Sequence, residues 1–75
     1  MNYIKESFAY KVTLIGGKEL FIEGHRGIVS YSDQEIICRV KRDKLEISGE
    51  KLFVKEINED ELLVSGIVLG VRVIK

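Results

Sequence analysis

Apolar and polar residues alternate along most of the chain. In the first such stretch, Tyr10, Val12 and Leu14 alternate with Lys11 and Thr13. The same alternation recurs at residues 19–23, 36–41, 44–48, 51–55, 62–66 and 69–73. Because successive side chains of an extended strand point to opposite faces, this period of two predicts strands with one buried and one solvated face.

Turn-forming residues interrupt the alternating stretches at short intervals. They lie at residues 16–17, 24–27, 32–33, 42–43, 48–49, 58–60 and 65–66. Strands of about five residues between such turns are typical of all-β proteins, and connections this short leave no room for crossover helices. The pattern predicts a compact single-domain antiparallel sheet or sandwich of about seven to eight short strands.

The predicted core consists of the apolar residues in one phase of each strand. These residues are Val12, Leu14, Leu20, Ile22, Ile36, Val40, Leu45, Ile47, Leu52, Val54, Leu62, Val64, Leu69 and Val71. Cys38 lies in the same phase as Ile36 and Val40. It is predicted to be a small core side chain, because a reactive thiolate needs an exposed, electropositive setting.

Three segments share a pattern of strand, glycine and strand. Residues 45–54 match residues 62–71, and residues 13–22 form a looser third copy. Self-similarity of this kind is also found in solenoids, so a short β-solenoid is the alternative fold. The match gives Gly49 and Gly66 equivalent positions, and both are predicted to have backbone conformations that a side chain would strain.

Length and composition restrict the class of protein. The 75 residues are predicted to form one domain, with a leader at residues 1–7 and the remaining strands in residues 8–74. A domain of this size buries only about 60% of its unfolded surface, so self-association or a partner would add stability. The 12 basic and 12 acidic residues cancel, whereas nucleic-acid-binding domains usually carry a basic excess.

The sequence shows no membrane or secretory segment. It contains no stretch of about 20 apolar residues that would cross a bilayer. Residues 1–10 include Lys5 and Glu6 and lack the apolar centre of a signal peptide. A single cysteine cannot form an internal disulfide. The predicted compartment is therefore the cytoplasm.

The polar cluster at residues 24–27 has two interpretations. In the first, His25 and Arg26 contact an anion or a partner protein from a glycine-rich turn. In the second, Gly27 supplies a positive φ, as Gly17 does in the preceding turn, and the two side chains are solvated or bonded to local carbonyl groups. The single histidine and cysteine have no metal-ligand spacing. No catalytic, metal or cofactor site is expected.

Some apolar residues lie out of phase with the predicted core. Phe21 and Phe53 occupy equivalent positions in the repeat, and each is flanked by predicted core residues. Ile37, Leu63 and Val68 are also out of phase with the predicted core. Apolar side chains on the outer face of a sheet indicate an interface or a covering layer. The residues predicted to bind a partner are therefore Phe21, Phe53, Ile37, Leu63, His25 and Arg26.

Taken together, these blocks resemble a known family. The front half contains Val-Thr-Leu-Ile-Gly at residues 12–16, Leu-Phe-Ile-Glu-Gly-His-Arg-Gly-Ile at residues 20–28, and then Tyr31 and Ser32. The back half contains Leu-Glu-Ile-Ser-Gly at residues 45–49 and Glu-Leu-Leu-Val-Ser-Gly-Ile at residues 61–67. In their order and spacing, the blocks resemble the YabP/YqfC family of sporulation proteins, on its YqfC side, over residues 8–74.

The resemblance implies a non-enzymatic protein of the mother cell that acts in spore morphogenesis or coat assembly. It also implies a working relation with the sporulation membrane protein YqfD, peripheral to the forespore membrane. The residues themselves agree with an interaction or scaffold module that forms homo-oligomers, since they combine a small core with apolar outer positions. The alternative is a small nucleic-acid-binding barrel of the OB or Sm-like type. Zero net charge and dispersed aromatic residues weigh against it.

Overall fold

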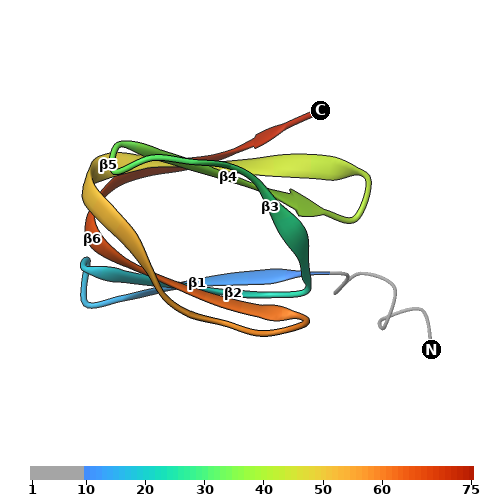
Figure 1. The fold of residues 1–75 in the computed structure, drawn as a ribbon, viewed down its shortest axis with the longest axis horizontal. Coiled ribbons are helices and arrows are strands. Elements are labelled where there is room, and N and C mark those ends of the chain that lie inside the picture. The colour runs from blue at the N-terminus through green and yellow to red at the C-terminus, as the bar shows by residue number, and fades with distance from the viewer. Residues whose placement is uncertain (1–9) are drawn as a thin grey trace.

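The computed structural model describes residues 10–75, and within them the structure is entirely β (Figure 1). The predicted leader at residues 1–7 lies outside the described residues. Six strands follow one another: β1 (Lys11–Ile15), β2 (Glu19–Glu23), β3 (His25–Tyr31), β4 (Glu35–Val40), β5 (Asp43–Ile57) and β6 (Glu61–Ile74). The predicted all-β fold is thereby confirmed.

All six strands belong to one antiparallel sheet in the order β1-β2-β6-β5-β4-β3. The sheet folds over on itself, and β5 and β6 curve through both halves (Figure 1). We call the half with β1, β2, the start of β6 and the end of β5 the lower layer. The half with β3, β4, the start of β5 and the end of β6 is the upper layer. The sheet does not form the alternative solenoid.

The strand count is six because two pairs of predicted strands are continuous. Residues 43–57 form the single strand β5, and residues 61–74 form β6. The chain bends within each strand instead of turning between two. Register shifts in the β5–β6 ladder mark the bend, at Ser48/Gly49 and at Glu50/Phe53.

Two glycines make the bend sterically feasible. At Gly49, a Cβ atom would overlap the carbonyl oxygen of Ile67 on the neighbouring strand. At Gly66, φ is 124°, and a Cβ would lie 2.5 Å from the carbonyl oxygen of Lys51. Lys51 itself has a φ of 54°, in the left-handed region. The predicted strain thus applies to Gly66, whereas Gly49 is required by the close approach of two backbones.

The core lies between the two layers. Its buried side chains are Leu20, Ile22, Ile36, Cys38, Val40, Leu45, Ile47, Leu52, Leu62 and Val64. All were predicted to be buried, and the predicted core residues Val12 and Val54 pack against them. The two layers therefore pack against each other through the side chains that the alternating pattern predicted to be buried.

Three predicted core residues are wrong: Leu14, Leu69 and Val71 are 57%, 68% and 39% exposed. Leu69 is exposed because a bulge between the pairs Ser48–Gly70 and Gly49–Val68 shifts the phase by one residue. The same shift turns Val68, predicted to face outward, against the core. Leu14 and Val71 lie on strands at the borders of their layers, where the opposite layer covers less of their surface.

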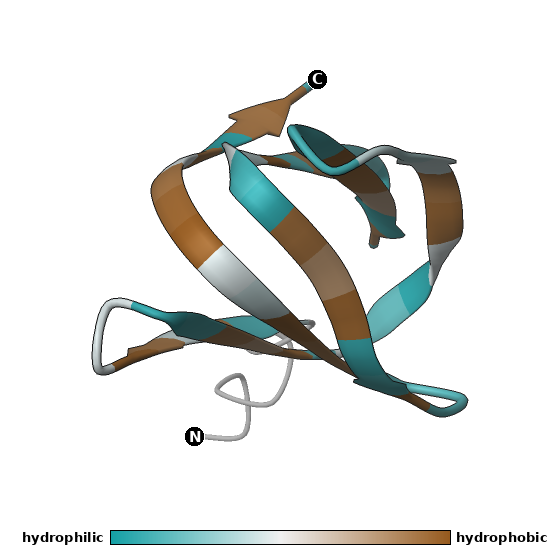
Figure 2. Cartoon of the chain, turned by 60° about the vertical axis from the view of Figure 1, so that its left-hand side comes forward, coloured by the Kyte–Doolittle hydropathy of each residue, from teal (hydrophilic) through white to brown (hydrophobic). Residues whose placement is uncertain are grey.

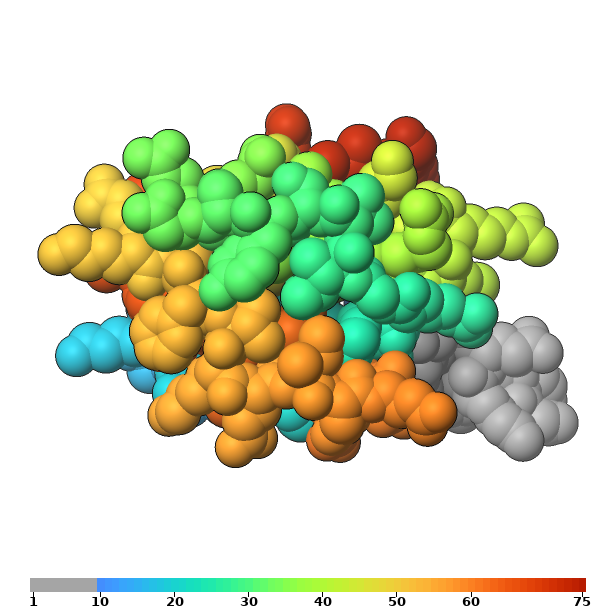
Figure 3. Space-filling model, in the orientation of Figure 1, coloured from blue at the N-terminus to red at the C-terminus, as the bar shows by residue number. Residues whose placement is uncertain are grey.

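On one side of the molecule, hydrogen bonds close the gap between the layers. The turn between β3 and β4 accepts bonds from β5: Gly49 N–H donates to Gln34 O at 3.0 Å, and Leu52 N–H donates to Asp33 O at 2.8 Å. The Tyr31 hydroxyl accepts a bond from Val54 N–H at 3.2 Å. Side chains of β3 rest against the second half of β5 on the face shown in Figure 3. This border of β5 is therefore partly covered.

Candidate interaction surface

Three of the predicted contact residues lie on the outer face of the lower layer. Phe21 in β2 pairs with Leu63 in β6, and both are half-buried. Phe53 in β5 pairs with Ser65 of the same β6 segment and is 48% exposed. Since Leu20 and Ile22 are buried in the core, strand alternation places Phe21 on the opposite, outer face. We call Phe21, Phe53 and Leu63 the aromatic face.

An ion pair crosses β6 beside the aromatic face. The Lys55 ammonium of β5 donates to the Glu19 carboxylate of β2 at 2.8 Å. Glu19 and Phe53 both pair with Ser65, so the ion pair and the phenylalanine share one row of the sheet. The bond to Glu19 raises the pKa of Lys55. Because both groups are solvated, the pair orients a contact more than it strengthens one.

Ile37 lies elsewhere. It pairs with Glu46 of β5 and with Ser30 of β3, on the outer face of the upper layer. Its neighbours Ile36 and Cys38 are buried, so the side chain of Ile37 points away from the core. The sequence predicted its outward orientation correctly, but the structure does not bring it together with the aromatic face.

His25 is buried, with 5% of its surface exposed. Its Nδ1 accepts a bond from Gly27 N–H at 3.0 Å, and its Nε2 lies 2.9 Å from the Asn58 carbonyl oxygen. A nitrogen that accepts carries no proton, so the proton is on Nε2, which donates to Asn58. Both ring nitrogens are thereby satisfied within the chain. Of the two predicted turn residues, only Arg26 is exposed.

The hydrogen bonds of His25 stabilise a corner of the fold. At Gly24 the chain leaves β2 of the lower layer and enters β3 of the upper layer. Gly24 N–H donates to Asp60 O at 2.6 Å. Asn58 closes the β5–β6 turn, because its side-chain oxygen accepts bonds from the N–H groups of Asp60 and Glu61. His25 therefore connects this corner to the β5–β6 hairpin. Its carbonyl partner is 33 residues away in the sequence, whereas the second interpretation assumed a local carbonyl group or solvent.

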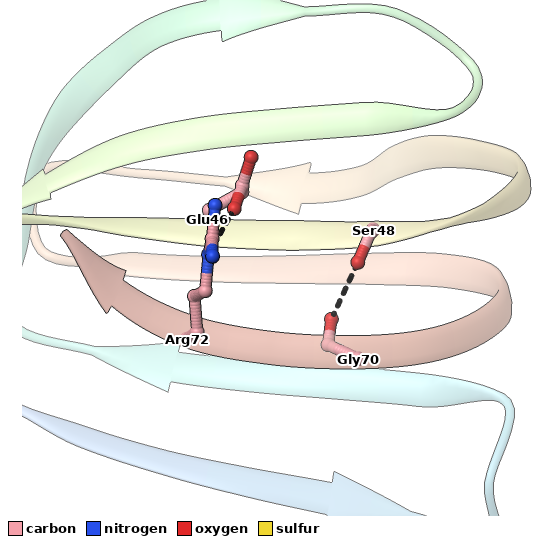
Figure 4. A network of polar contacts seen from close by, with 4 residues as sticks. All are labelled: Glu46, Ser48, Gly70 and Arg72. Atoms are coloured by element: carbon pink, nitrogen blue, oxygen red, sulfur yellow. Dashed lines mark hydrogen bonds and ion pairs between the residues drawn. The ribbon is translucent and has the colours of Figure 1, made fainter.

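A polar cluster on the outer face of the upper layer was not predicted from the sequence. The Arg72 Nε of β6 donates to the Glu46 carboxylate of β5 at 2.6 Å, and the Ser48 hydroxyl lies 3.4 Å from the Gly70 carbonyl oxygen (Figure 4). Glu35 of β4 pairs with Ser48. These residues come together through the β4–β5 register and through the β5–β6 register, which includes a bulge, and the sequence alone does not reveal the latter.

Two carboxyl groups share this cluster. A hydrogen bond between Glu35 and Glu46 raises the pKa of Glu35, and burial and the charge of Glu46 raise it further. The same bond, followed by the bond from Arg72, lowers the pKa of Glu46. As the pH falls, Glu35 is therefore the first of the two to take up a proton, and Arg72 is the cation that balances Glu46.

Replacing Glu35 with glutamine is expected to raise the thermal midpoint at neutral pH. In the variant, the glutamine amide donates a hydrogen bond to Glu46 at every pH. In the wild type, the carboxylates of Glu35 and Glu46 repel each other above the raised pKa of Glu35. The gain should shrink as the pH falls toward the ordinary glutamate pKa of 4.5, because wild-type Glu35 then acquires its proton. Thermal unfolding from pH 4 to 8 checks this, with exposed Glu50→Gln as the control. A gain that is independent of pH would contradict it.

Cys38 is fully buried among core residues. Burial raises the pKa of its thiol to about 11. A neutral thiol shielded from solvent is a poor nucleophile and a poor metal ligand. Its predicted place in the core is confirmed.

Two kinds of site are missing from the part of the chain that the structure describes. Residues 10–75 hold no group of three or more histidine, cysteine, aspartate or glutamate side chains placed to bind a metal ion. The same residues include no helix long and apolar enough to span a membrane.

Comparison with known proteins identifies the family. A sequence model of the YabP family matches residues 6–73, nearly the whole chain. The chain belongs to the YabP family. This YabP-family chain is also 31% identical over 65 residues to the uncharacterized protein YqfC of Bacillus subtilis (strain 168). That match spans 87% of the present chain and 70% of the relative.

The family assignment confirms the resemblance found in the sequence. The matched region includes all six strands of this YabP-family chain apart from the last residue of β6. It therefore includes the aromatic face and the corner at His25. Membership of the YabP family indicates a sporulation-related protein, as the resemblance implied.

Proposed function

We propose that this YabP-family chain is a non-enzymatic interaction module that acts in spore morphogenesis or coat assembly. The observation that supports it best is the aromatic face. Phe21, Leu63 and Phe53 belong to three different strands, yet lie on one outer surface next to the solvated Lys55–Glu19 ion pair. A large apolar side chain such as Phe53, 48% exposed, gains most when a partner covers it.

The position of the aromatic face fits protein recognition. It lies on the outer surface of paired strands: β2 and the start of β6 have a ladder on both sides, and the end of β5 is paired with β6. Rigid aromatic side chains are common anchors of protein interfaces because they bury much surface at a low entropic cost. Nearby charges such as Glu19 and Lys55 supply orientation. The proposed partners are coat proteins or proteins at the forespore membrane, with YqfD as the first to test.

The test is a pull-down from sporulating cells with the tagged full-length chain. The wild-type chain should retrieve specific coat or forespore-membrane proteins. The double variant Phe21→Ser/Phe53→Ser should lose them while keeping its β circular dichroism. The matched control, Leu14→Ser/Val29→Ser, changes two exposed apolar residues on other strands, with 57% and 46% exposure, and should retain them.

Any of three results would overturn the proposal. The first is that the wild-type chain retrieves no protein, and the second is that the aromatic-face variant retrieves the same proteins as the wild type. The third is that the chain binds nucleic acid with an affinity that falls steeply with salt. If the double variant unfolds, Phe53→Ser alone provides the same comparison, because Phe53 is half exposed and its loss costs the core little.

A further inference from the structure

Among the described residues 10–75, the last part of β6 forms an open border of the sheet in the upper layer. Residues 67–74 pair with β5 on one side, while β2 pairs with β6 only as far as Ser65. This border lies at the outside of the fold in Figure 2, where much of it is coloured as apolar. Its exposed large apolar side chains are Ile67, Leu69, Val71 and Val73. A long apolar border of this kind favours pairing with another strand.

The hydrogen bonds of β5 reveal which backbone groups of this border are free to pair. Gly49 N–H bonds to Gln34, toward β4. Since N–H groups alternate in direction along a strand, Ser48 and Glu46 direct theirs toward β6. Their partners Gly70 and Arg72 therefore bond to β5. In between, Val71 directs its N–H and C=O outward, as does Val73.

Two carboxyl groups lie beside Arg72 at this border, and the basic residues Lys44 and Arg39 follow one row further along the same face. Arg72 is the only charged residue in residues 67–74. It forms an ion pair with Glu46, which lies on β5 next to β4, the strand that contains Glu35. Next to Arg72 is an open hollow lined by Glu46, Ser48, Gly70, Val71 and Arg72. Because Gly70 has no side chain, the hollow has room for a side chain from another molecule. The Glu46 carboxylate in its lining favours a cation there.

We propose that this border pairs antiparallel with the same border of a second copy, around a two-fold axis at Val71. In this register, Arg72 of each copy lies opposite Gly70 of the other and enters the hollow beside Ser48. Each pair of carboxyl groups then gains a second cation. The neighbouring register would place the two Arg72 side chains directly opposite each other, where like charges are unfavourable.

This arrangement has the features of a symmetric dimer. One strand segment supplies both halves of the contact, as a two-fold interface requires. Val71 and Val73, 39% and 41% exposed although they share a face with core residues of β5, acquire a neighbour from the second strand. The inference is independent of the aromatic face, which lies on the other layer.

The first test is the mass of the full-length chain in solution, measured by sedimentation or light scattering from micromolar to millimolar concentration. The wild type should approach twice its monomer mass of 8.6 kDa. Val71→Pro should remain a monomer, because proline removes an outward N–H and leaves the β5 ladder intact. Leu69→Lys should also remain a monomer. The matched control Ile57→Lys changes an apolar residue of similar exposure at the β5 border and should still dimerise.

Amide hydrogen exchange provides a second measurement that needs no variant. The amides of Val71 and Val73 should exchange at least tenfold more slowly at high than at low protein concentration. A wild type that stays monomeric, a dimer that persists in Val71→Pro or Leu69→Lys, or exchange rates independent of concentration would overturn the proposal. Slow exchange in a monomer would mean that another part of the same chain covers the border. Each of these results leaves the pull-down of the aromatic face unaffected.

Discussion

Replacing Gly49 with alanine is expected to destabilise the fold by about 3 kcal/mol. The new Cβ atom would overlap the Ile67 carbonyl oxygen, which belongs to a paired strand and cannot move aside like a flexible side chain. Gly66→Ala should cost a similar amount, because a close contact with Lys51 adds to a φ of 124°. Urea unfolding followed by circular dichroism measures both changes.

Two other glycines separate the cost of backbone strain from the cost of steric overlap. Gly17 has a φ of 71° but open space around it, so Gly17→Ala should cost about 1 kcal/mol through backbone strain alone. Gly70 has only the Ser48 hydroxyl 3.4 Å away, and Gly70→Ala should change the free energy of unfolding by less than about 0.5 kcal/mol. If all four variants were equally stable, the close packing at the bend would not control the fold.

Replacing His25 with phenylalanine is expected to cost about 2 kcal/mol. The substitution keeps an aromatic ring in the buried site but leaves Gly27 N–H and the Asn58 carbonyl without their side-chain partner. His25→Asn should recover part of the loss by accepting from Gly27. The adjacent Arg26→Ala should cost less than about 0.5 kcal/mol, because Arg26 is exposed.

The imidazole nitrogen spectrum tests the same geometry without a substitution. In the native protein, ¹⁵N shifts should identify Nε2 as the protonated nitrogen, as required for a ring that accepts from Gly27 and donates to Asn58. A native protein with the proton on Nδ1, or a His25→Phe variant as stable as the wild type, would contradict the proposed role of His25 in the corner.

Alternation was sufficient to predict the strands and most of the core, since burial of one face imposes a period of two. It failed where the backbone itself breaks the period. The bulge at Leu69 exchanges the orientations of Leu69 and Val68, and the sequence does not mark it. The number of strands was also overestimated, because turn-forming residues such as Gly49 and Gly66 produce a bend within a strand as readily as a turn between two.

The candidate site was partly predictable for the same reason. Phe21 and Leu63 were identified because they are out of phase with buried neighbours on their own strands. Whether out-of-phase residues of different strands lie together depends on strand order, so the separation of Ile37 from Phe21 was not predictable. The contact of Glu46 with Arg72, 26 residues apart, likewise depends on the ladder between two long strands.

The continuity of β5 and β6 through both layers also determines how the molecule can open. Each layer contains half of both strands, and the two halves are joined by one ladder that continues through the bend with register shifts, instead of by a linker. Separating the layers would break that ladder at its centre, so the layers are not independent folding units. Unfolding should be a single cooperative event, and opening below the global free energy should be confined to the border strands β1 and β3.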